Sequence, residues 1–254
     1  MNPADLLAVA RPIAVEVGER LLASFDGDGP TVDHKSTETD LVTDLDLWSE
    51  AFITERLLDA RPHDTVMGEE EAAVAGSSEV TWWVDPIDGT VNFVHGMPGF
   101  NISIAAVVDD RPVAGVVVSP LHHDVFEAYI GGGAFRNGQA IRCGQPASLA
   151  QSVIGTGFSY EAPRRQRQAE VLAAMIGDIA DIRRIGGSAV DLCSVACGRL
   201  DGYWEVGLHR WDHSAGELIA REAGARVEGV DGAVPGEEIV VAAPPVIFDD
   251  LMAL

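Results

Sequence analysis

The spacing of the apolar residues changes along the chain, and this change constrains the fold more than any other feature of the sequence. Residues 4–25 carry apolar side chains at helical spacing, which predicts an amphipathic helix. A second helix is expected to begin at Thr43, with Asp46 three residues later as in a capping box, and to end at Arg61. Short β-type runs separated by turn residues follow at 81–84, 102–108, 113–118 and 125–130. Because these runs are closely spaced, we expect an antiparallel meander.

After about residue 150 the two spacings alternate. Strands are expected near 153–156, 182–184, 200–205 and 239–242. Helices are expected over 164–177, 188–197 and 213–223, with a short one at the C-terminus. Such alternation predicts a layered α/β unit. We therefore divide the chain into an N-terminal α+β half, residues 1–147, and a C-terminal α/β half, residues 148–254, although no flexible linker marks the boundary.

The charge balance bears on possible partners. The 254 residues include 40 acidic and 17 basic side chains, for a formal net charge of -23. A net charge of this size produces a negative electrostatic field, which repels nucleic acid and anionic membranes and attracts divalent cations. An anionic substrate would therefore need metal ions in order to bind. No apolar run approaches the roughly 20 residues that span a bilayer, and the first residues lack signal-peptide features, so we expect a cytoplasmic protein. Cys193 and Cys197 lie four residues apart in an apolar segment, which favours core packing.

One segment carries two carboxylates at the end of an apolar run. Asp85 precedes a proline, which favours an extended backbone, and Asp88 lies three residues later at a turn that Gly89 permits. Thr90 follows where a helix could begin, so its hydroxyl could face a ligand. Paired carboxylates suit Mg²⁺, which prefers oxygen ligands. Asp-Pro and Asp-Gly are also ordinary turn signals, so this segment alone leaves both interpretations open.

Two more acidic segments lie elsewhere in the sequence. Glu69, Glu70 and Glu71 follow a short β-type run, which puts carboxylates at the end of a strand. Glu205 precedes a loop, and Asp212 stands where the helix after that loop begins. Helix capping alone would account for Asp212.

Together these segments resemble the inositol monophosphatase family, whose members are lithium-sensitive, magnesium-dependent phosphatases. The resemblance rests on Gly68-Glu69-Glu70, on Asp85-Pro86-Ile87-Asp88-Gly89-Thr90 and on Trp211-Asp212. It extends to Lys35, Asp40-Leu41-Val42-Thr43, Gly133-Ala134-Phe135 and Gly187-Ser188-Ala189, and so covers nearly the whole chain. It implies a layered αβαβα sandwich, an active site in the cleft between the two halves, and a homodimer.

The resemblance also implies a role for each matching residue. Two to three Mg²⁺ ions are expected. The ligands of the first would be Glu69, Asp85, the carbonyl of Ile87 and Thr90, and those of the second Asp85, Asp88 and Asp212. A third, weaker ion would be bound by Glu69 and waters. The catalytic residues would be Glu69, Thr90 and Asp46, the last two orienting the water that attacks phosphorus. Substrate would contact Asp88, Gly89, Thr90, Ser188, Ala189, Glu205 and Asp212, with the N–H groups of Gly89 and Thr90 on the phosphate. The implied mechanism is direct attack by a metal-activated water, without a phospho-enzyme.

Several alternatives remain open at this point. His209 and His213 lie four apart around Asp212, which would suit zinc if the segment were helical, but the other expected ligands are all oxygen. The glycines at 131–133 lack the spacing of a nucleotide-binding loop. Within the family, inositol 1-phosphate is the expected substrate, and histidinol phosphate, fructose bisphosphate or adenosine bisphosphate are alternatives. A different class of function is a regulatory binding partner.

Overall fold

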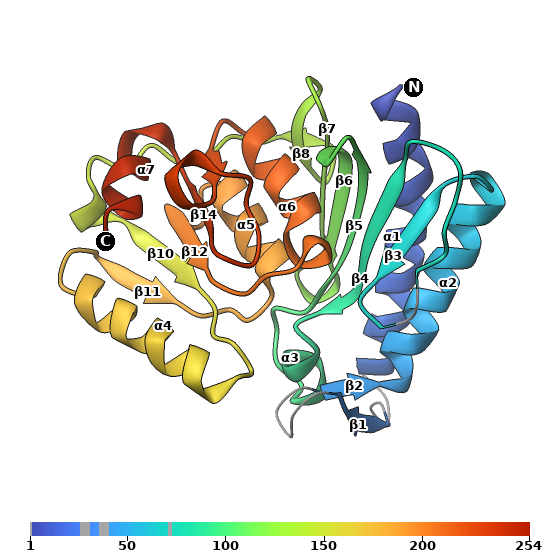
Figure 1. The fold of residues 1–254 in the computed structure, drawn as a ribbon, viewed down its shortest axis with the longest axis horizontal. Coiled ribbons are helices and arrows are strands. Elements are labelled where there is room, and N and C mark those ends of the chain that lie inside the picture. The colour runs from blue at the N-terminus through green and yellow to red at the C-terminus, as the bar shows by residue number, and fades with distance from the viewer. Residues whose placement is uncertain (1, 26–30, 36–40, 71–72) are drawn as a thin grey trace.

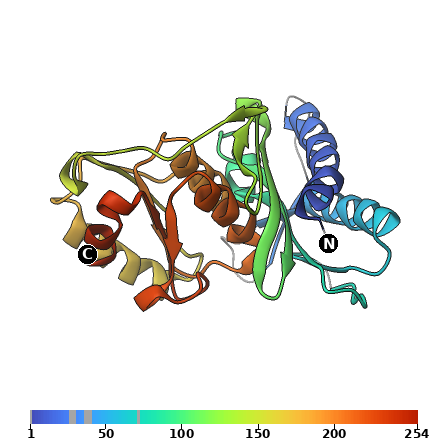
Figure 2. The same ribbon diagram turned by 90° about the horizontal axis from the view of Figure 1, so that it is seen from above.

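The computed structural model describes residues 2–25, 31–35, 41–70 and 73–254. Asp40 and Glu71, named above, lie outside these ranges. The chain forms five layers in the order helix, sheet, helix, sheet, helix, seen edge-on in Figure 1 and from above in Figure 2. The expected αβαβα sandwich is therefore confirmed.

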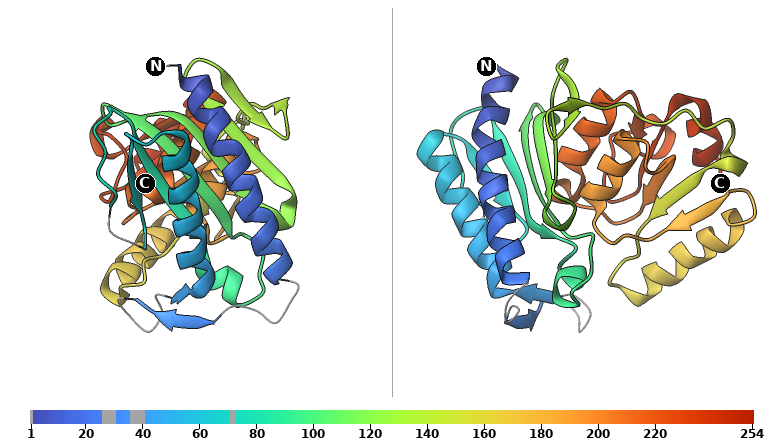
Figure 3. Two further views of the ribbon diagram at one scale, coloured as in Figure 1. Left: turned by 90° about the vertical axis from the view of Figure 1, so that its right-hand side faces the viewer. Right: turned by 180° about the vertical axis from the view of Figure 1, so that it is seen from behind.

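Helices α1 (Pro3–Phe25) and α2 (Asp44–Ala60) form the first outer layer and lie side by side on one face of a sheet (Figure 3). Thr43 caps α2, and Asp46 completes the expected capping box. The apolar faces of both helices bury against the sheet in one cluster that includes Leu6, Leu21 and Leu57. A two-stranded ribbon, β1 (Val32–His34) with β2 (Leu41–Thr43), precedes α2.

The first sheet has seven strands in chain order, and all neighbours are antiparallel except the first pair. Its strands are β3 (Thr65–Gly68), β4 (Thr81–Asp88), β5 (Asn101–Val108), β6 (Arg111–Ser119), β7 (Asp124–Tyr129), β8 (Gly133–Arg136) and β9 (Gln139–Ala140). The expected meander is present as β4 to β7. Trp82 and Trp83 point to opposite faces, with Trp82 fully buried under α1 and α2.

Helices α5 (Ser188–Ala196) and α6 (Arg210–Glu222) fill the space between the two sheets. Every residue of α5 is buried, including Cys193, as the core-packing interpretation expects. Small residues allow α6 to lie close to the first sheet. A Cβ built at Gly115 in β6 would lie 3.0 Å from the Cα of Ala215 in α6. One apolar cluster joins the inner face of the first sheet, both helices and the second sheet.

The second sheet has five strands in the order β11-β10-β12-β14-β13. Their bounds are β10 (Val153–Thr156), β11 (Asp181–Arg183), β12 (Gly202–Glu205), β13 (Arg226–Glu228) and β14 (Val240–Ala243). Helices α4 (Ala162–Met175) and α7 (Pro245–Met252) belong to the other outer layer, and Met175 and Phe248 pack in its apolar cluster. Short helical turns lie at α3 (Thr90–Val94), η1 (Pro120–His122), η2 (Leu149–Gln151) and η3 (Val230–Gly232).

Two details differ from the sequence expectations. Helix α6 begins at Arg210 and not at 213, because Asp212 is its third residue and accepts a hydrogen bond from the N–H of His209 in a capping box. Strands β1, β2, β8, β9 and β13 were not expected, since runs of two to four residues carry little alternation. No helix in the described part of the chain is long and apolar enough to cross a membrane.

Candidate active site

A bulge in β4 brings Asp85 and Asp88 to the same face of the first sheet. Residues three apart in a regular strand point to opposite faces. Here Asp85 pairs with Ser103 and Asp88 with Asn101, so three steps along β4 match two along β5. Because Ser103 and Asn101 share a face, the two aspartates share it as well. Pro86 lies within the bulge, where its missing N–H removes no regular ladder bond.

The carboxylate of Asp88 accepts hydrogen bonds from both halves of the chain. Asn101 donates from Nδ2 at 2.9 Å, and the backbone N–H groups of Ser188 and Ala189 donate at 3.1 and 2.8 Å. Burial nevertheless raises the pKa of Asp88 to about 6, because it outweighs these donors and the negative charge of Glu69 adds to it. Asp88 therefore connects β4 to the first turn of α5.

Asp85 lies deeper, with 1% of its surface exposed. Its Oδ1 accepts a hydrogen bond of 3.1 Å from the N–H of Ile87. Burial raises the pKa of Asp85 well above its usual value, and the charges of Glu69, Asp88 and Asp212 raise it further. The four carboxylates of Glu69, Asp85, Asp88 and Asp212, which we call the carboxylate cluster, thus lie within electrostatic reach of one another.

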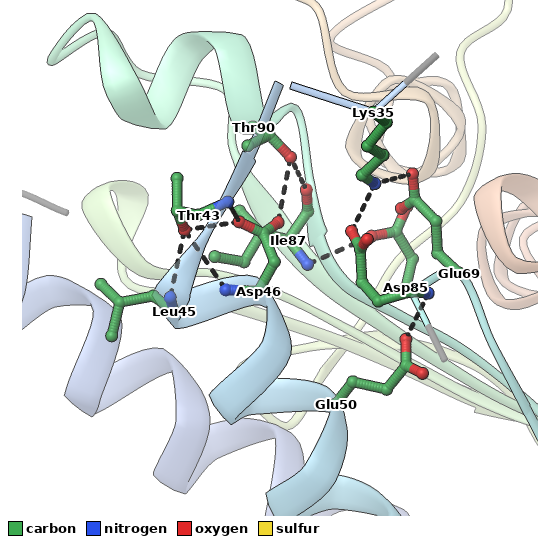
Figure 4. A network of polar contacts seen from close by, with 10 residues as sticks. Lys35, Thr43, Leu45, Asp46, Glu50, Glu69, Asp85, Ile87 and Thr90 are labelled. Atoms are coloured by element: carbon green, nitrogen blue, oxygen red, sulfur yellow. Dashed lines mark hydrogen bonds and ion pairs between the residues drawn. The ribbon is translucent and has the colours of Figure 1, made fainter. Parts of the chain in front are cut away.

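Lys35 neutralises part of this cluster (Figure 4). Its Nζ lies 2.8 Å from Oε1 of Glu69 and also contacts Glu70. Burial opposes the charge on Lys35, but the two glutamates outweigh it and raise its pKa. Glu70 has a pKa of about 7, raised by burial and by Glu69 in spite of the lysine. The N–H of Glu70 donates 2.8 Å to Oε2 of Glu50, a buried residue of α2 that the sequence reasoning missed.

Thr90 and Asp46 form a second network beside the cluster (Figure 4). The hydroxyl of Thr90 lies 3.1 Å from Oδ1 of Asp46 and 3.0 Å from the carbonyl oxygen of Ile87. Thr43 donates to Oδ2 of Asp46 from its N–H at 2.8 Å and from its hydroxyl at 2.5 Å. Burial raises the pKa of Asp46 against these donors. The cap of α2 therefore fixes the carboxylate that faces Thr90.

Asp212 comes to the cluster from α6. Its Oδ2 accepts a 2.6 Å hydrogen bond from the N–H of His209, and its backbone carbonyl accepts 2.8 Å from the hydroxyl of Ser188. Burial, followed by the charges of Glu69 and Asp88, raises the pKa of Asp212 well above its usual value.

Glu205 ends β12, and its carboxylate is held on two sides. The buried hydroxyl of Tyr203 donates 2.5 Å to Oε2, and a Cβ built at Gly157 would collide with the carboxylate. The pKa of Glu205 is about 7, raised by burial and by Asp88 although Tyr203 and Arg184 lower it. The structure therefore places an acidic group that titrates near neutral pH beside the cluster.

Most of the expected site residues border one cavity of about 330 Å³. Those that line it are Glu69, Asp88, Gly89, Ser188, Glu205 and Asp212. The expected site residues that do not line it are Asp46, Asp85, Ile87, Thr90 and Ala189, all of them buried. Residues from both sheets and from α5 and α6 thus border the same space.

The donor chemistry of the cluster fits a hard divalent cation. All four side chains offer carboxylate oxygens, and each raises the cost of ionising its neighbours, which a bound cation would relieve. Among the described residues, no three His, Cys, Asp or Glu side chains are already arranged as a metal site. Two members of the cluster have other partners, since Glu69 contacts Lys35 and Asp212 accepts from the N–H of His209.

The two histidines around Asp212 do not face a common point. Nδ1 of His213 lies 3.2 Å from Glu217 inside the core, whereas Nδ1 of His209 lies 3.2 Å from Glu237 at the surface. The zinc alternative therefore gains no support.

The similarity to known proteins extends over nearly the whole chain. A model described as the inositol monophosphatase family matches residues 2–253. A relative from Mycobacterium bovis, named inositol-1-monophosphatase, is 42% identical over 99% of this chain and 93% of its own length. A relative from Pasteurella multocida, named Nus factor SuhB, is 38% identical over 99% of this chain and 95% of its own length. The crystal structure of extragenic suppressor protein suhB from Bartonella henselae has a TM-score of 0.91 and 33% identity, covering 98% of this chain and 97% of that one.

Proposed function

Because the chain belongs to the inositol monophosphatase family, we propose that it is a Mg²⁺-dependent phosphatase that releases phosphate from inositol 1-phosphate. The observation that carries the proposal is the carboxylate cluster, in which burial and mutual repulsion oppose ionisation beside a cavity large enough for a small phosphorylated polyol. The M. bovis relative's name supports the choice of inositol 1-phosphate.

The metal ligands are proposed residue by residue. Glu69, Asp85, the carbonyl of Ile87 and Thr90 would hold one Mg²⁺, and Asp85, Asp88 and Asp212 a second, with Glu69 supporting a weaker third. Bound Mg²⁺ would neutralise charge on the phosphoryl group and make water more acidic. Lithium inhibition would follow if Li⁺ competes for the second position.

Thr90 and Asp46 would orient the attacking water. A hydroxyl has one hydrogen, and that of Thr90 is directed to Asp46 or to the carbonyl of Ile87. The remaining lone pairs of the Thr90 oxygen can accept a hydrogen from water. Thr43, the cap of α2, donates to Oδ2 of Asp46 and so fixes the carboxylate whose Oδ1 contacts the hydroxyl of Thr90. The start of α2 therefore helps to orient Thr90.

The rest of the cavity would bind the substrate. The N–H groups of Gly89 and Thr90 lie at the start of α3, where amides lack intrahelical acceptors and can donate to phosphate oxygens. Glu205 would accept hydrogen bonds from substrate hydroxyls. Ser188 and Ala189 would also contact the substrate, while their backbone N–H groups donate to Asp88.

Two alternatives follow from specific observations. Glu205 could also pair with a cationic amine, which keeps histidinol phosphate as a second candidate substrate. The P. multocida relative is named a Nus factor, which supports a role as a regulatory binding partner instead of, or beside, catalysis.

The test is phosphate release in the presence of Mg²⁺ from inositol 1-phosphate, histidinol phosphate, fructose 1,6-bisphosphate and adenosine 3′,5′-bisphosphate. We expect turnover that stops when the metal is chelated, with the highest kcat/KM for inositol 1-phosphate among the monophosphates. Preference for histidinol phosphate would contradict the assignment of inositol 1-phosphate as the substrate. Absence of turnover with all four would overturn the enzymatic proposal and favour the binding partner.

A further inference from the structure

Two arginines line the cavity that the carboxylate cluster borders. Arg164 belongs to the first turns of α4, and Arg184 follows β11, so both come from the second sheet and its outer layer. No role assigned above uses either side chain.

Neither arginine has an ion-pair partner within residues 2–25, 31–35, 41–70 and 73–254. Five other arginines of the described residues also lack such a partner, namely Arg20, Arg111, Arg142, Arg165 and Arg167, but none of these five lines the cavity. The remaining arginines of the chain pair with a nearby carboxylate. Arg136 and Arg199, for example, both pair with the buried Asp124. The charge of Arg184 reaches Glu205 without forming such a pair.

The backbone next to each guanidinium is a glycine with positive φ. Gly207 has φ +95° and lies against Arg164, with Cζ 3.4 Å from the position a Cβ would take. Gly186 has φ +102° and lies against Arg184. At both glycines a Cβ would collide with Nη1 of the arginine. Two separate loops thus leave room for a guanidinium beside the same cavity.

We propose that Arg164 and Arg184 form an anion-binding subsite for a second acidic group of the substrate, a phosphate or a carboxylate distant from the phosphate that is hydrolysed. A guanidinium binds both groups through paired N–H donors and stays charged at all relevant pH values. This inference rests on the proposed function and narrows its substrate class. Inositol 1-phosphate would be turned over, but a polyol phosphate with an acidic far end would be the better substrate.

The test compares three open-chain substrates that share six carbons and differ only at the far end. Glucitol 6-phosphate ends in a hydroxymethyl group, 6-phosphogluconate in a carboxylate and glucitol 1,6-bisphosphate in a phosphate. We expect kcat/KM to be about tenfold higher for at least one acidic substrate, as one or two charge-assisted hydrogen bonds would give. Which of the two is preferred identifies the group. For the bisphosphate the preference must exceed the gain of about twofold that comes from carrying two hydrolysable phosphates.

The variant R164A should remove this preference while leaving kcat/KM for glucitol 6-phosphate within about twofold. R184A should remove the preference as well, and because Arg184 also lowers the pKa of Glu205, its loss on glucitol 6-phosphate at pH 7 should shrink as pH rises. R167A is the matched control, since Arg167 is exposed on the same helix and does not line the cavity. Arg164 is half-buried and Arg184 exposed, so neither truncation opens the core, and thermal unfolding checks this.

Two results would overturn the subsite. One is equal kcat/KM for all three substrates in the wild type. The other is an equal loss on all three substrates in R164A and R184A, which would mean that the arginines only support the fold or Glu205. Absence of turnover with every phosphomonoester would instead overturn the proposed function, and the subsite with it.

Discussion

The backbone N–H of Ala189 donates a hydrogen bond of 2.8 Å to Oδ2 of Asp88. The acceptor lies on the first sheet, and the donor lies in the first turn of the helix that separates the two sheets. A carboxylate proposed as a metal ligand is therefore also a connection between two layers of the fold.

Replacing Asp88 with Asn should separate these two roles. The amide keeps one acceptor oxygen, which can serve the N–H of Ala189, but it places an NH2 group opposite the N–H of Ser188 and loses the charge. We therefore expect kcat with Mg²⁺ to fall about 100-fold or more. The pKa of Asp88 is raised to about 6, so the wild-type carboxylate reduces stability as pH rises from about 4 to 6. The unfolding temperature of metal-free D88N, relative to that of wild type, should therefore be higher at pH 8 than at pH 4. Asp59→Asn, at an exposed position of α2, is the control. Full activity in D88N would contradict the ligand assignment.

The hydroxyl of Thr90 can be tested by a matched pair of substitutions. Thr90→Val keeps the shape but removes the contacts with Asp46 and the carbonyl of Ile87, and we expect kcat to fall about 100-fold. Thr90→Ser retains the hydroxyl and should keep at least a tenth of the activity. Steady-state kinetics at saturating Mg²⁺ measures both. Equal activity in the two variants would show that the hydroxyl does not orient the water.

Tyr203→Phe removes the hydrogen bond that holds Glu205. Without this donor the pKa of Glu205 should rise above its present value of about 7, since Tyr203 lowers it. We expect KM for inositol 1-phosphate to rise about threefold to tenfold at pH 7, with kcat changed less. The KM difference from wild type should shrink as pH rises and Glu205 ionises in both proteins. Tyr129→Phe, on β7, is the control. An equal change of KM in both variants would contradict the role of Tyr203 in holding Glu205.

Glu50 should matter for metal affinity through the segment it anchors. Its carboxylate accepts the N–H of Glu70, next to the proposed ligand Glu69, and a Cβ at Gly68 would collide with it. Glu50→Ala should raise the Mg²⁺ concentration for half-maximal activity about tenfold, while kcat at saturating Mg²⁺ changes little. Glu50→Gln keeps an acceptor oxygen and should restore most of the affinity. An unchanged Mg²⁺ dependence in E50A would contradict the positioning role.

The sequence was sufficient for elements with long periodic patterns. The helices at α1 and α2 and the strands β4 to β7 follow from spacing, and Thr43 and Asp46 mark where α2 begins. The segment from Asp85 to Thr90 stood out because it places acids, proline and glycine together at the end of a strand. The roles assigned to these residues remain predictions.

The bulge that aligns Asp85 with Asp88 could not be derived, because it is set by pairing with β5 and leaves no local pattern beyond Pro86. The contact of Glu205 with Tyr203 was missed although both lie on one strand. Glu50 had a usable signal, since it lies four residues after Asp46 and so shares a helix face with it.

The order of the site residues along the chain has a consequence for biosynthesis. Glu69, Asp85 and Asp88 leave the ribosome more than a hundred residues before Asp212, and roughly a hundred before the N–H groups of Ser188 and Ala189 that stabilise Asp88. A nascent chain that ends before α5 therefore carries Asp88 without two of its three donors and lacks the last carboxylate. Such a chain should neither retain magnesium nor hydrolyse phosphate esters, so activity would appear only when synthesis is almost complete.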